Sequence, residues 1–143
     1  KYRGYCSDMT RMIFTSKPTP LQAKIYNIVL AAQTAAILKL KANIKGREAD
    51  KCSRDIINAS GYGKYFGHSL GHGIGLEVHE SPSLATRYSN TLPVDTVVTV
   101  EPGIYLKNSF GVRIEDMVLI KHNKAINLTK IPKDIKANIV SIS

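Results

Sequence analysis

Four side chains of metal-binding types stand out along this chain of 143 residues. Asp8, Glu101 and Glu115 lie within or at the ends of β-favouring stretches, where a buried carboxylate is costly unless it is paired or bound to a cation. His72 lies in the glycine- and histidine-rich segment 67–80. A mixed set of carboxylates and imidazole suits Mn²⁺, Zn²⁺, Co²⁺ or Fe²⁺, and carboxylates can bridge two metal ions that activate a shared water molecule in hydrolases.

Taken one at a time, these residues do not specify a site. For each carboxylate, the simpler interpretation is an edge-strand or salt-bridged group. His68 and His72 have the spacing of a helical zinc pair, but the glycines around them disfavour a helix and no Glu lies between them. The alternating glycines of residues 71–75 lack the spacing of a dinucleotide-binding loop. We expect these glycines to give a substrate backbone room to pass.

The elements that must position these side chains are predicted from hydrophobic periodicity. Residues 1–14 have the composition of a strand. Apolar residues at helical spacing predict a long helix over residues 21–43, capped by Thr19 or Ser16. A second helix is predicted over residues 46–57, before a pair of closely spaced glycines.

The second half of the chain has the pattern of strands. Residues 96–100, 111–120 and 125–128 are predicted strands, whereas residues 81–83 and 90–93 are predicted loops. The order of a strand, two helices and then further strands indicates an α+β domain with helices on one face of a mostly antiparallel sheet.

The composition restricts the function classes. The net charge of +9 is spread along the chain without a basic run, which favours a solvated surface over nucleic-acid binding. Cys6 and Cys52 predict free thiols rather than a disulfide framework. The N-terminus is polar, and the apolar run 28–40 is too short to span a bilayer, so we expect a soluble cytoplasmic protein without a membrane partner.

Four ordered motifs closely resemble the metal-dependent proline peptidases. They are residues 4–11 (GYCSDMTR), 67–82 (GHSLGHGIGLEVHESP), 101–105 (EPGIY) and 113–116 (RIED). The family comprises the Xaa-Pro dipeptidases (prolidases) and Xaa-Pro aminopeptidases, which are relatives of methionine aminopeptidase with the pita-bread fold. The resemblance runs over nearly the whole chain and implies the C-terminal part of that fold, with two helices packed on a curved, mostly antiparallel sheet.

The resemblance implies a metal-binding role for four residues. Asp8 and Glu115 correspond to the carboxylates that bridge two metal ions. His72 and Glu101 correspond to further ligands of one ion, and Glu101 also shuttles a proton of the attacking water. The implied cofactor is a pair of divalent ions, with Mn²⁺ favoured and Zn²⁺, Co²⁺ or Fe²⁺ as alternatives.

Four more residues match the substrate side of the family. His79 corresponds to a catalytic histidine that hydrogen-bonds the scissile carbonyl, and His68 to a second catalytic histidine of the proline-specific branch. Arg113 corresponds to an arginine near the carboxylate end of the substrate. Tyr105 is predicted to line the pocket.

One expected feature is absent from the sequence. Members of the family use a fifth ligand, an aspartate just before the first motif, and this chain begins at Lys1. We therefore expect residues 1–143 to be the C-terminal part of a catalytic domain, without its first half and without an upstream domain. Such a segment should bind one metal ion weakly to moderately and a second poorly, and should be inactive without the missing half. Whether the parent enzyme forms a homodimer stays open.

The implied reaction is hydrolysis of the bond preceding proline, with a metal-bridging hydroxide as the nucleophile. The sequence leaves open whether the substrate is an Xaa-Pro dipeptide or a longer Xaa-Pro peptide. A different class would be a non-catalytic pita-bread protein, either a chaperone or a nucleic-acid-associated factor, and creatine amidinohydrolase uses the fold without metal. The set of four ligand-type residues counts against both alternatives.

Overall fold

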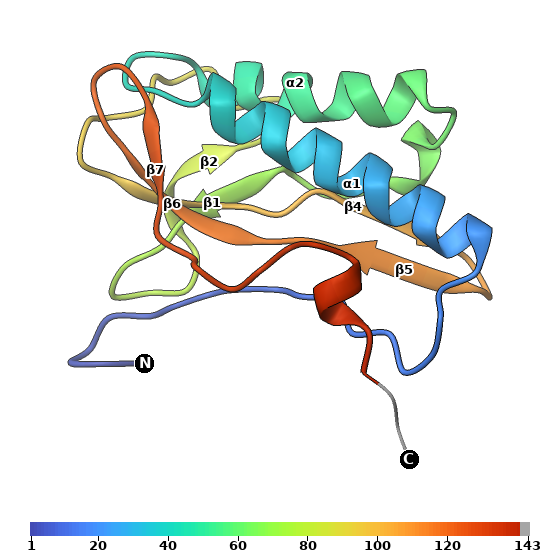
Figure 1. Ribbon diagram of the computed structural model, residues 1–143. Helices are drawn as coiled ribbons and strands as arrows, with labels where there is room; N and C mark the ends of the chain where they lie inside the picture. Colours follow the sequence, from blue (N-terminus) through green and yellow to red (C-terminus); the bar gives the residue numbers. More distant parts are fainter. Residues whose placement is uncertain (141–143) are drawn as a thin grey trace.

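Two helices pack on one face of antiparallel β-structure, which confirms the predicted α+β class. The computed structural model describes residues 1–140. Helix α1 spans Pro20–Lys39, and helix α2 spans Gly46–Ala59. Figure 1 shows the two helices side by side on one face, whereas the N-terminal and C-terminal segments cross the opposite side.

The strands form a larger and a smaller antiparallel sheet. The larger sheet has the order β2-β1-β3-β6-β7, and its strands are β1 (Gly71–Gly73), β2 (Glu80–Leu84), β3 (Val97–Val100), β6 (Asp116–Ile120) and β7 (Ala125–Asn127). The smaller sheet pairs β4 (Gly103–Leu106) with β5 (Phe110–Arg113). Short 3₁₀ helices occupy Gly63–Tyr65 and Lys136–Asn138. The chain crosses from the larger sheet to the smaller one at Glu101 and returns at Glu115.

Capping residues fix the ends of the helices much as predicted. The Thr19 hydroxyl accepts a hydrogen bond from the Gln22 amide at the start of α1, and the Gln22 side chain accepts one from the Thr19 backbone. This reciprocal pair satisfies two backbone donors that the first turn leaves free. Helix α2 ends before Gly61, which has a φ of +84° that favours glycine.

The end of α1 at Asn43 was predicted wrongly. The helix stops at Lys39, Leu40 has an extended backbone, and residues 42–43 form a turn whose amides bond to distant backbone. The Ala42 amide donates to the Lys121 carbonyl at 3.0 Å, and the Asn43 amide donates to the Leu92 carbonyl at 2.9 Å. These long-range bonds replace the last helical turn, and no pattern local to the helix encodes them.

Helix α1 is also apolar along most of its length. Among residues 1–140, it is the one helix long and apolar enough, by length and composition alone, to cross a membrane. In this fold its inner face is part of the core instead, with Ile25, Tyr26 and Val29 fully buried. A core helix passes the same compositional test.

The core has two parts that follow the two sheets. One packs the C-terminal half of α1 and the start of α2 against the larger sheet, through residues such as Ala36, Leu40, Leu70, Val98 and Val118. The other packs the N-terminal half of α1 and the end of α2 against the smaller sheet, through residues such as Val29, Ile57, Ile104, Val112 and Ile114. Along α1, the change from one part to the other falls between Ala32 and Ala36.

The predicted strand over residues 1–14 is not a regular strand. Its residues form only single bridges, and each bridge has a different partner: Tyr2 with Tyr5, Thr10 with Glu115 and Phe14 with Ile139. The β-favouring composition is present, but no sheet edge runs beside the segment for more than one residue. The prediction was therefore wrong about the element, although the segment is extended near Asp8 and Thr10.

Three further strand predictions need correction. The predicted strand 111–120 is split into β5 and β6, because the chain changes sheets at Ile114–Glu115. Residues 81–83 were predicted as a loop but belong to β2, an edge strand, where a proline is tolerated. Strands β1 and β4 were not predicted; two of the three residues of β1 are glycines, which are depleted in strands.

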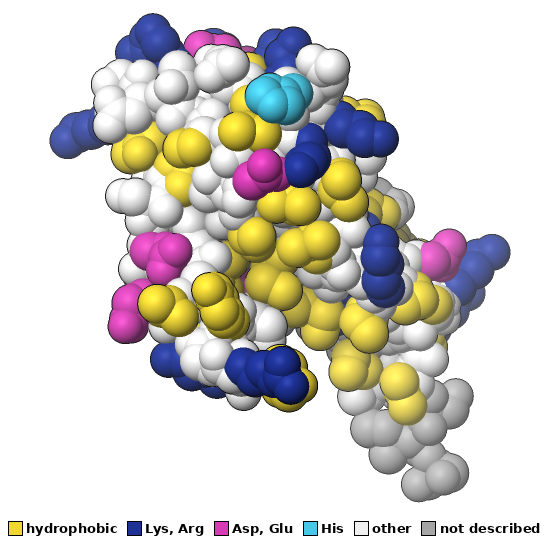
Figure 2. All heavy atoms as spheres, turned by 90° about the vertical axis from the view of Figure 1, so that its left-hand side faces the viewer, with side chains coloured by type: hydrophobic (Ala, Val, Ile, Leu, Met, Phe, Trp, Pro, Cys, Tyr) yellow, Lys and Arg dark blue, Asp and Glu magenta, His cyan; other side chains and the backbone are white. Residues whose placement is uncertain are grey.

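The charged side chains are dispersed on one face of the surface. Figure 2 shows Lys and Arg side chains scattered among acidic and hydrophobic ones on the face it displays, rather than gathered in one patch. Cys6 and Cys52 are free thiols, as predicted.

Candidate functional site

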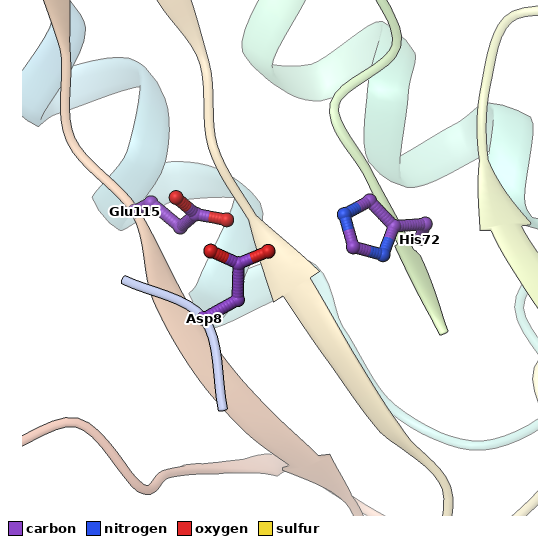
Figure 3. Close-up of side chains that lie close together, drawn as sticks. All are labelled: Asp8, His72 and Glu115. Atoms are coloured by element: carbon purple, nitrogen blue, oxygen red, sulfur yellow. The ribbon is translucent and has the colours of Figure 1, made fainter. Parts of the chain in front are cut away.

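Three of the four predicted ligand residues converge on one point. Asp8, His72 and Glu115 each present a ligand atom, and these atoms lie within 4.8 Å of one another. They come from the N-terminal segment, from β1 and from the residue before β6. Figure 3 shows the carboxylates of Asp8 and Glu115 next to each other, with the imidazole of His72 turned toward them.

Glu101 joins this group through His72. Its Oε1 lies 3.3 Å from Nε2 of His72, and it accepts a weak hydrogen bond from the Thr99 hydroxyl at 3.4 Å. The other ring nitrogen of His72, Nδ1, lies 2.9 Å from the Gly73 carbonyl, which can only accept, so Nδ1 carries a proton. This bond fixes the ring and leaves Nε2 directed at the site, as is common for metal-binding histidines.

The electrostatics of the site reflect its crowding with carboxylates. Burial raises the pKa of Glu115 above its usual value, and the negative charges of Glu101 and Asp8 raise it further. Burial also acts to raise the pKa of Glu101, but the hydrogen bond to His72 and nearby positive charges outweigh it and hold that pKa below its usual value. The same hydrogen bond raises the pKa of His72.

The four predicted substrate-side residues surround the same place. The ring of His79 lies beside that of His72, with 4.3 Å between ring centroids. His68 Nε2 lies 3.1 Å from the Tyr105 hydroxyl. Arg113 Nη1 lies 3.9 Å from Glu101 Oε2. The charge of His68 also acts on Glu101, and the charges of Arg113 and Glu101 act on Tyr105, so all eight predicted site residues are part of one continuous neighbourhood.

Two threonines in this neighbourhood were missed by the sequence analysis. The Thr10 hydroxyl donates to Glu115 Oε2 at 2.5 Å and accepts from Arg113 Nε at 3.0 Å. Thr99 bonds both Glu101 and the backbone amide of His72. Each threonine lies two residues from a predicted ligand along extended backbone, so the period of two that places side chains on one face could have found them.

The loop that leads to His72 is held by an ion pair on α2. Arg54 makes two hydrogen bonds to Asp50, at 2.8 and 2.9 Å, and also donates to the carbonyls of Phe66 and His68. Asp50 in turn accepts from the Leu70 amide at 3.1 Å. The pair thus fixes the backbone on both sides of His68.

The expected role of the glycines around His72 was wrong at two positions. A Cβ added at Gly71 would lie 2.0 Å from the Thr99 carbonyl oxygen, and one at Gly73 would lie 2.4 Å from the Ser81 carbonyl oxygen. The space beside these glycines is filled by the backbone of neighbouring strands, so it is not open to a substrate. They allow β1 to fit closely between β2 and β3.

The donor set fits a divalent cation. Glu115 is only 2% exposed, and the side-chain hydrogen bond that it makes within residues 1–140 comes from a neutral hydroxyl. An ionised carboxylate at such burial is costly without a compensating positive charge. Carboxylates together with one imidazole are ligands that suit a divalent transition metal.

Comparison with known proteins identifies the family and the relatives of this chain. Residues 1–122 match the model of metallopeptidase family M24. An Xaa-Pro dipeptidase of Pyrococcus horikoshii is 46% identical over 134 residues, which cover 94% of this chain and 38% of that protein. The solved X-Pro aminopeptidase of Thermotoga maritima MSB8 matches with a TM-score of 0.94 and 45% identity, over 97% of this chain and 38% of the other.

The fold has a wider distribution. The N-terminal domain of FACT complex subunit SPT16 from Cicer arietinum matches with a TM-score of 0.86 and 26% identity, over 99% of this chain and 36% of the other. The fold alone therefore does not specify an activity.

The comparisons also show which part of the family's fold this chain forms. The chain spans about 34–38% of the length of the curated relatives it matches. Its structure is the C-terminal part of the pita-bread fold, as the sequence motifs implied. Because the family match covers residues 1–122 and includes all eight candidate side chains, the chain belongs to metallopeptidase family M24.

Proposed function

We propose that this chain is part of a metal-dependent peptidase that hydrolyses the peptide bond preceding proline. The observation that carries the proposal is the convergence of Asp8, His72 and Glu115, with Glu101 against His72. Relatives named Xaa-Pro dipeptidase and X-Pro aminopeptidase support the class of substrate.

Four residues would hold the metal ions. Asp8 and Glu115 would bridge two divalent cations, and His72 and Glu101 would complete the ligands of one of them. When bound, such cations lower the pKa of a water molecule and polarise the scissile carbonyl. We favour Mn²⁺ because three of the four donors are carboxylates, while Zn²⁺, Co²⁺ and Fe²⁺ suit the same set.

Glu101 is the residue that we assign to proton transfer. Its lowered pKa keeps the carboxylate ionised at neutral pH, and the Thr99 hydroxyl helps to orient it. It can therefore accept a proton from the attacking water and deliver it to the departing amine of proline.

The substrate side is assigned to residues around this centre. His79 is exposed beside His72 and would donate a hydrogen bond to the scissile carbonyl oxygen. His68 would contact the substrate from the other side, with Tyr105 at the pocket wall. The guanidinium of Arg113 is partly exposed and would bind the carboxylate of a short substrate.

We propose that the two cation positions of this chain differ in affinity. The resemblance to the family implies a fifth ligand, an aspartate that would precede Lys1. Without it, we expect residues 1–143 to bind one cation weakly to moderately and a second one poorly, and to lack peptidase activity without the first half of the domain. Calorimetric titration with Mn²⁺ tests this expectation, and two tight sites would contradict it.

The activity itself is tested in the longer protein. Release of the N-terminal residue from Ala-Pro should require Mn²⁺, stop on addition of chelator and fall by about 10²-fold or more in Glu101→Gln. Leu-Ala serves as the control substrate that lacks proline, and Ala-Pro-Gly distinguishes an aminopeptidase from a dipeptidase. Turnover that is insensitive to chelator would rule the mechanism out, and peptide binding without turnover would favour a non-catalytic protein.

A further inference from the structure

Helix α1 contains a buried polar side chain that the proposed reaction does not use. Gln33 is fully buried, as are its apolar neighbours Val29 and Ala36 along the same face. Burying an amide is costly unless its hydrogen bonds are satisfied. The contacts that Gln33 makes therefore reveal why an amide is retained at this position.

Both donors of the Gln33 amide are bound to backbone. Nε2 lies 3.1 Å from the carbonyl oxygen of Val100 and 3.1 Å from the carbonyl oxygen of Ile114. The side-chain oxygen accepts a hydrogen bond from Lys133 Nζ at 2.9 Å. A single side chain thus connects the end of β3, the segment between β5 and β6, and the C-terminal segment to α1.

These two carbonyls belong to the residues immediately before Glu101 and Glu115. Val100 ends β3, and Ile114 lies between β5 and β6, so both are at the points where the chain crosses between the two sheets. Regular strand pairing does not continue through these crossings. The Gln33 amide supplies one pair of donors to both crossings at once.

We propose that Gln33 is a positioning residue for the metal site, which ties together the backbone from which Glu101 and Glu115 project. The proposal rests on the proposed metal-binding function of those two carboxylates. Gln33 does not touch either carboxylate, so it acts through the separation and orientation of their backbone.

A buried ionic network holds the other side of Glu115. Arg11 Nη1 donates to the Glu115 carbonyl at 2.7 Å, and Arg11 Nη2 lies 2.6 Å from Asp116 Oδ1. Lys133, the partner of Gln33, lies 2.5 Å from Asp116 Oδ2. The carbonyls on both sides of the Glu115 side chain are therefore fixed, one by Gln33 and one by Arg11.

The substitution Gln33→Met tests this role. Methionine is unbranched and similar in length, so it fills the space but removes both donors. We expect Mn²⁺ affinity of the 143-residue chain, measured by calorimetry, to fall about tenfold or more, as when the hydrogen-bond partners that support metal ligands are lost. Val29→Ala is the matched control, because it lies one turn earlier at equal burial and contacts the apolar core.

The control separates positioning from general stability. Val29→Ala should lower the melting temperature of the metal-free chain but leave Mn²⁺ affinity within about twofold, because it leaves the hydrogen bonds of the Gln33 amide intact. If Gln33→Met does not fold, Gln33→Glu keeps the length and an acceptor for Lys133 but has neither N–H donor, so it cannot bond both carbonyls at once, and it should show the same loss of affinity.

The outcomes that would overturn the proposal are distinct. Wild-type affinity in Gln33→Met, or in Gln33→Glu where Gln33→Met does not fold, would remove the positioning role and leave the metal site intact. An equal loss of affinity in Val29→Ala would show that the effect is one of stability. A wild-type chain that binds no Mn²⁺ would overturn both the metal site and the role of Gln33.

Discussion

The histidine side and the carboxylate side of the site each depend on a fully buried aspartate. Asp50 supports the loop that carries His68, and Asp116 follows Glu115 directly in the chain. Asp50 pairs with Arg54, one helical turn away on α2. Asp116 pairs with Arg11 from the N-terminal segment and with Lys133 from the C-terminal segment.

This difference shows that the two sides are stabilised over different ranges of the chain. The Asp50 pair acts within one helix and on one adjacent loop, while β1 itself is held by close backbone packing at Gly71. The Asp116 network joins three segments that are far apart in sequence. We therefore expect damage to Asp116 to affect the whole centre and damage to Asp50 to remain local.

The largest effect is expected for Asp116→Asn. Removing this carboxylate charge leaves the Arg11 and Lys133 cations without their shared partner, and breaking a buried ion pair typically costs about 3–5 kcal/mol in the free energy of unfolding. Urea denaturation measures this loss. The stabilisation of the chain by added Mn²⁺ should also shrink, because Arg11 holds the Glu115 backbone. A smaller loss of unfolding free energy than in Asp50→Asn would show that the Asp116 network is not the more important of the two.

Gly71→Ala tests the close packing of the histidine strand. The added methyl group would meet the Thr99 backbone carbonyl, which cannot rotate away, so we expect a loss of up to about 3 kcal/mol in unfolding free energy. Gly67→Ala is the control, since a Cβ there has no atom within 4 Å. Similar unfolding curves for the two variants would contradict the packing argument.

A smaller and more selective effect is expected for Asp50→Asn. The Arg54 side chain is 23% exposed, so solvent compensates part of its charge, and we expect a loss of about 2 kcal/mol. In the longer protein, catalytic turnover should fall because His68 shifts, whereas Mn²⁺ affinity should stay within about twofold of wild type. Affinity that falls together with turnover would show that the two sides are not independent.

The smallest effect is expected for Asp55→Asn, which serves as the matched control for Asp50. The Lys51–Asp55 pair has the same spacing on the same helix, but its side chains are 72% and 57% exposed. Exposed pairs of this kind contribute about 0.5 kcal/mol or less. A change in urea midpoint as large as that of Asp50→Asn would mean that burial is not what distinguishes the pairs.

The comparison also explains where the sequence predictions succeeded. Both helices were predicted from apolar spacing, and the Thr19 cap was among the two proposed, because these features depend on residues only a few positions apart. Strand β3 was predicted for the same reason. Strand β1 was missed because it needs the backbone of β2 and β3 on either side, and its glycines look unfavourable in isolation.

The residue types in four short motifs determined which side chains were candidates for chemistry, and they did so without any coordinates. The tertiary structure alone decided that Thr10 binds Glu115, that the strand predicted over residues 111–120 breaks at the sheet crossing, and that Gln33 bridges both crossings. The physical reason is the separation along the sequence between the residues that interact. Helical periodicity and caps arise from neighbours within a turn, whereas these contacts join residues that no local window contains.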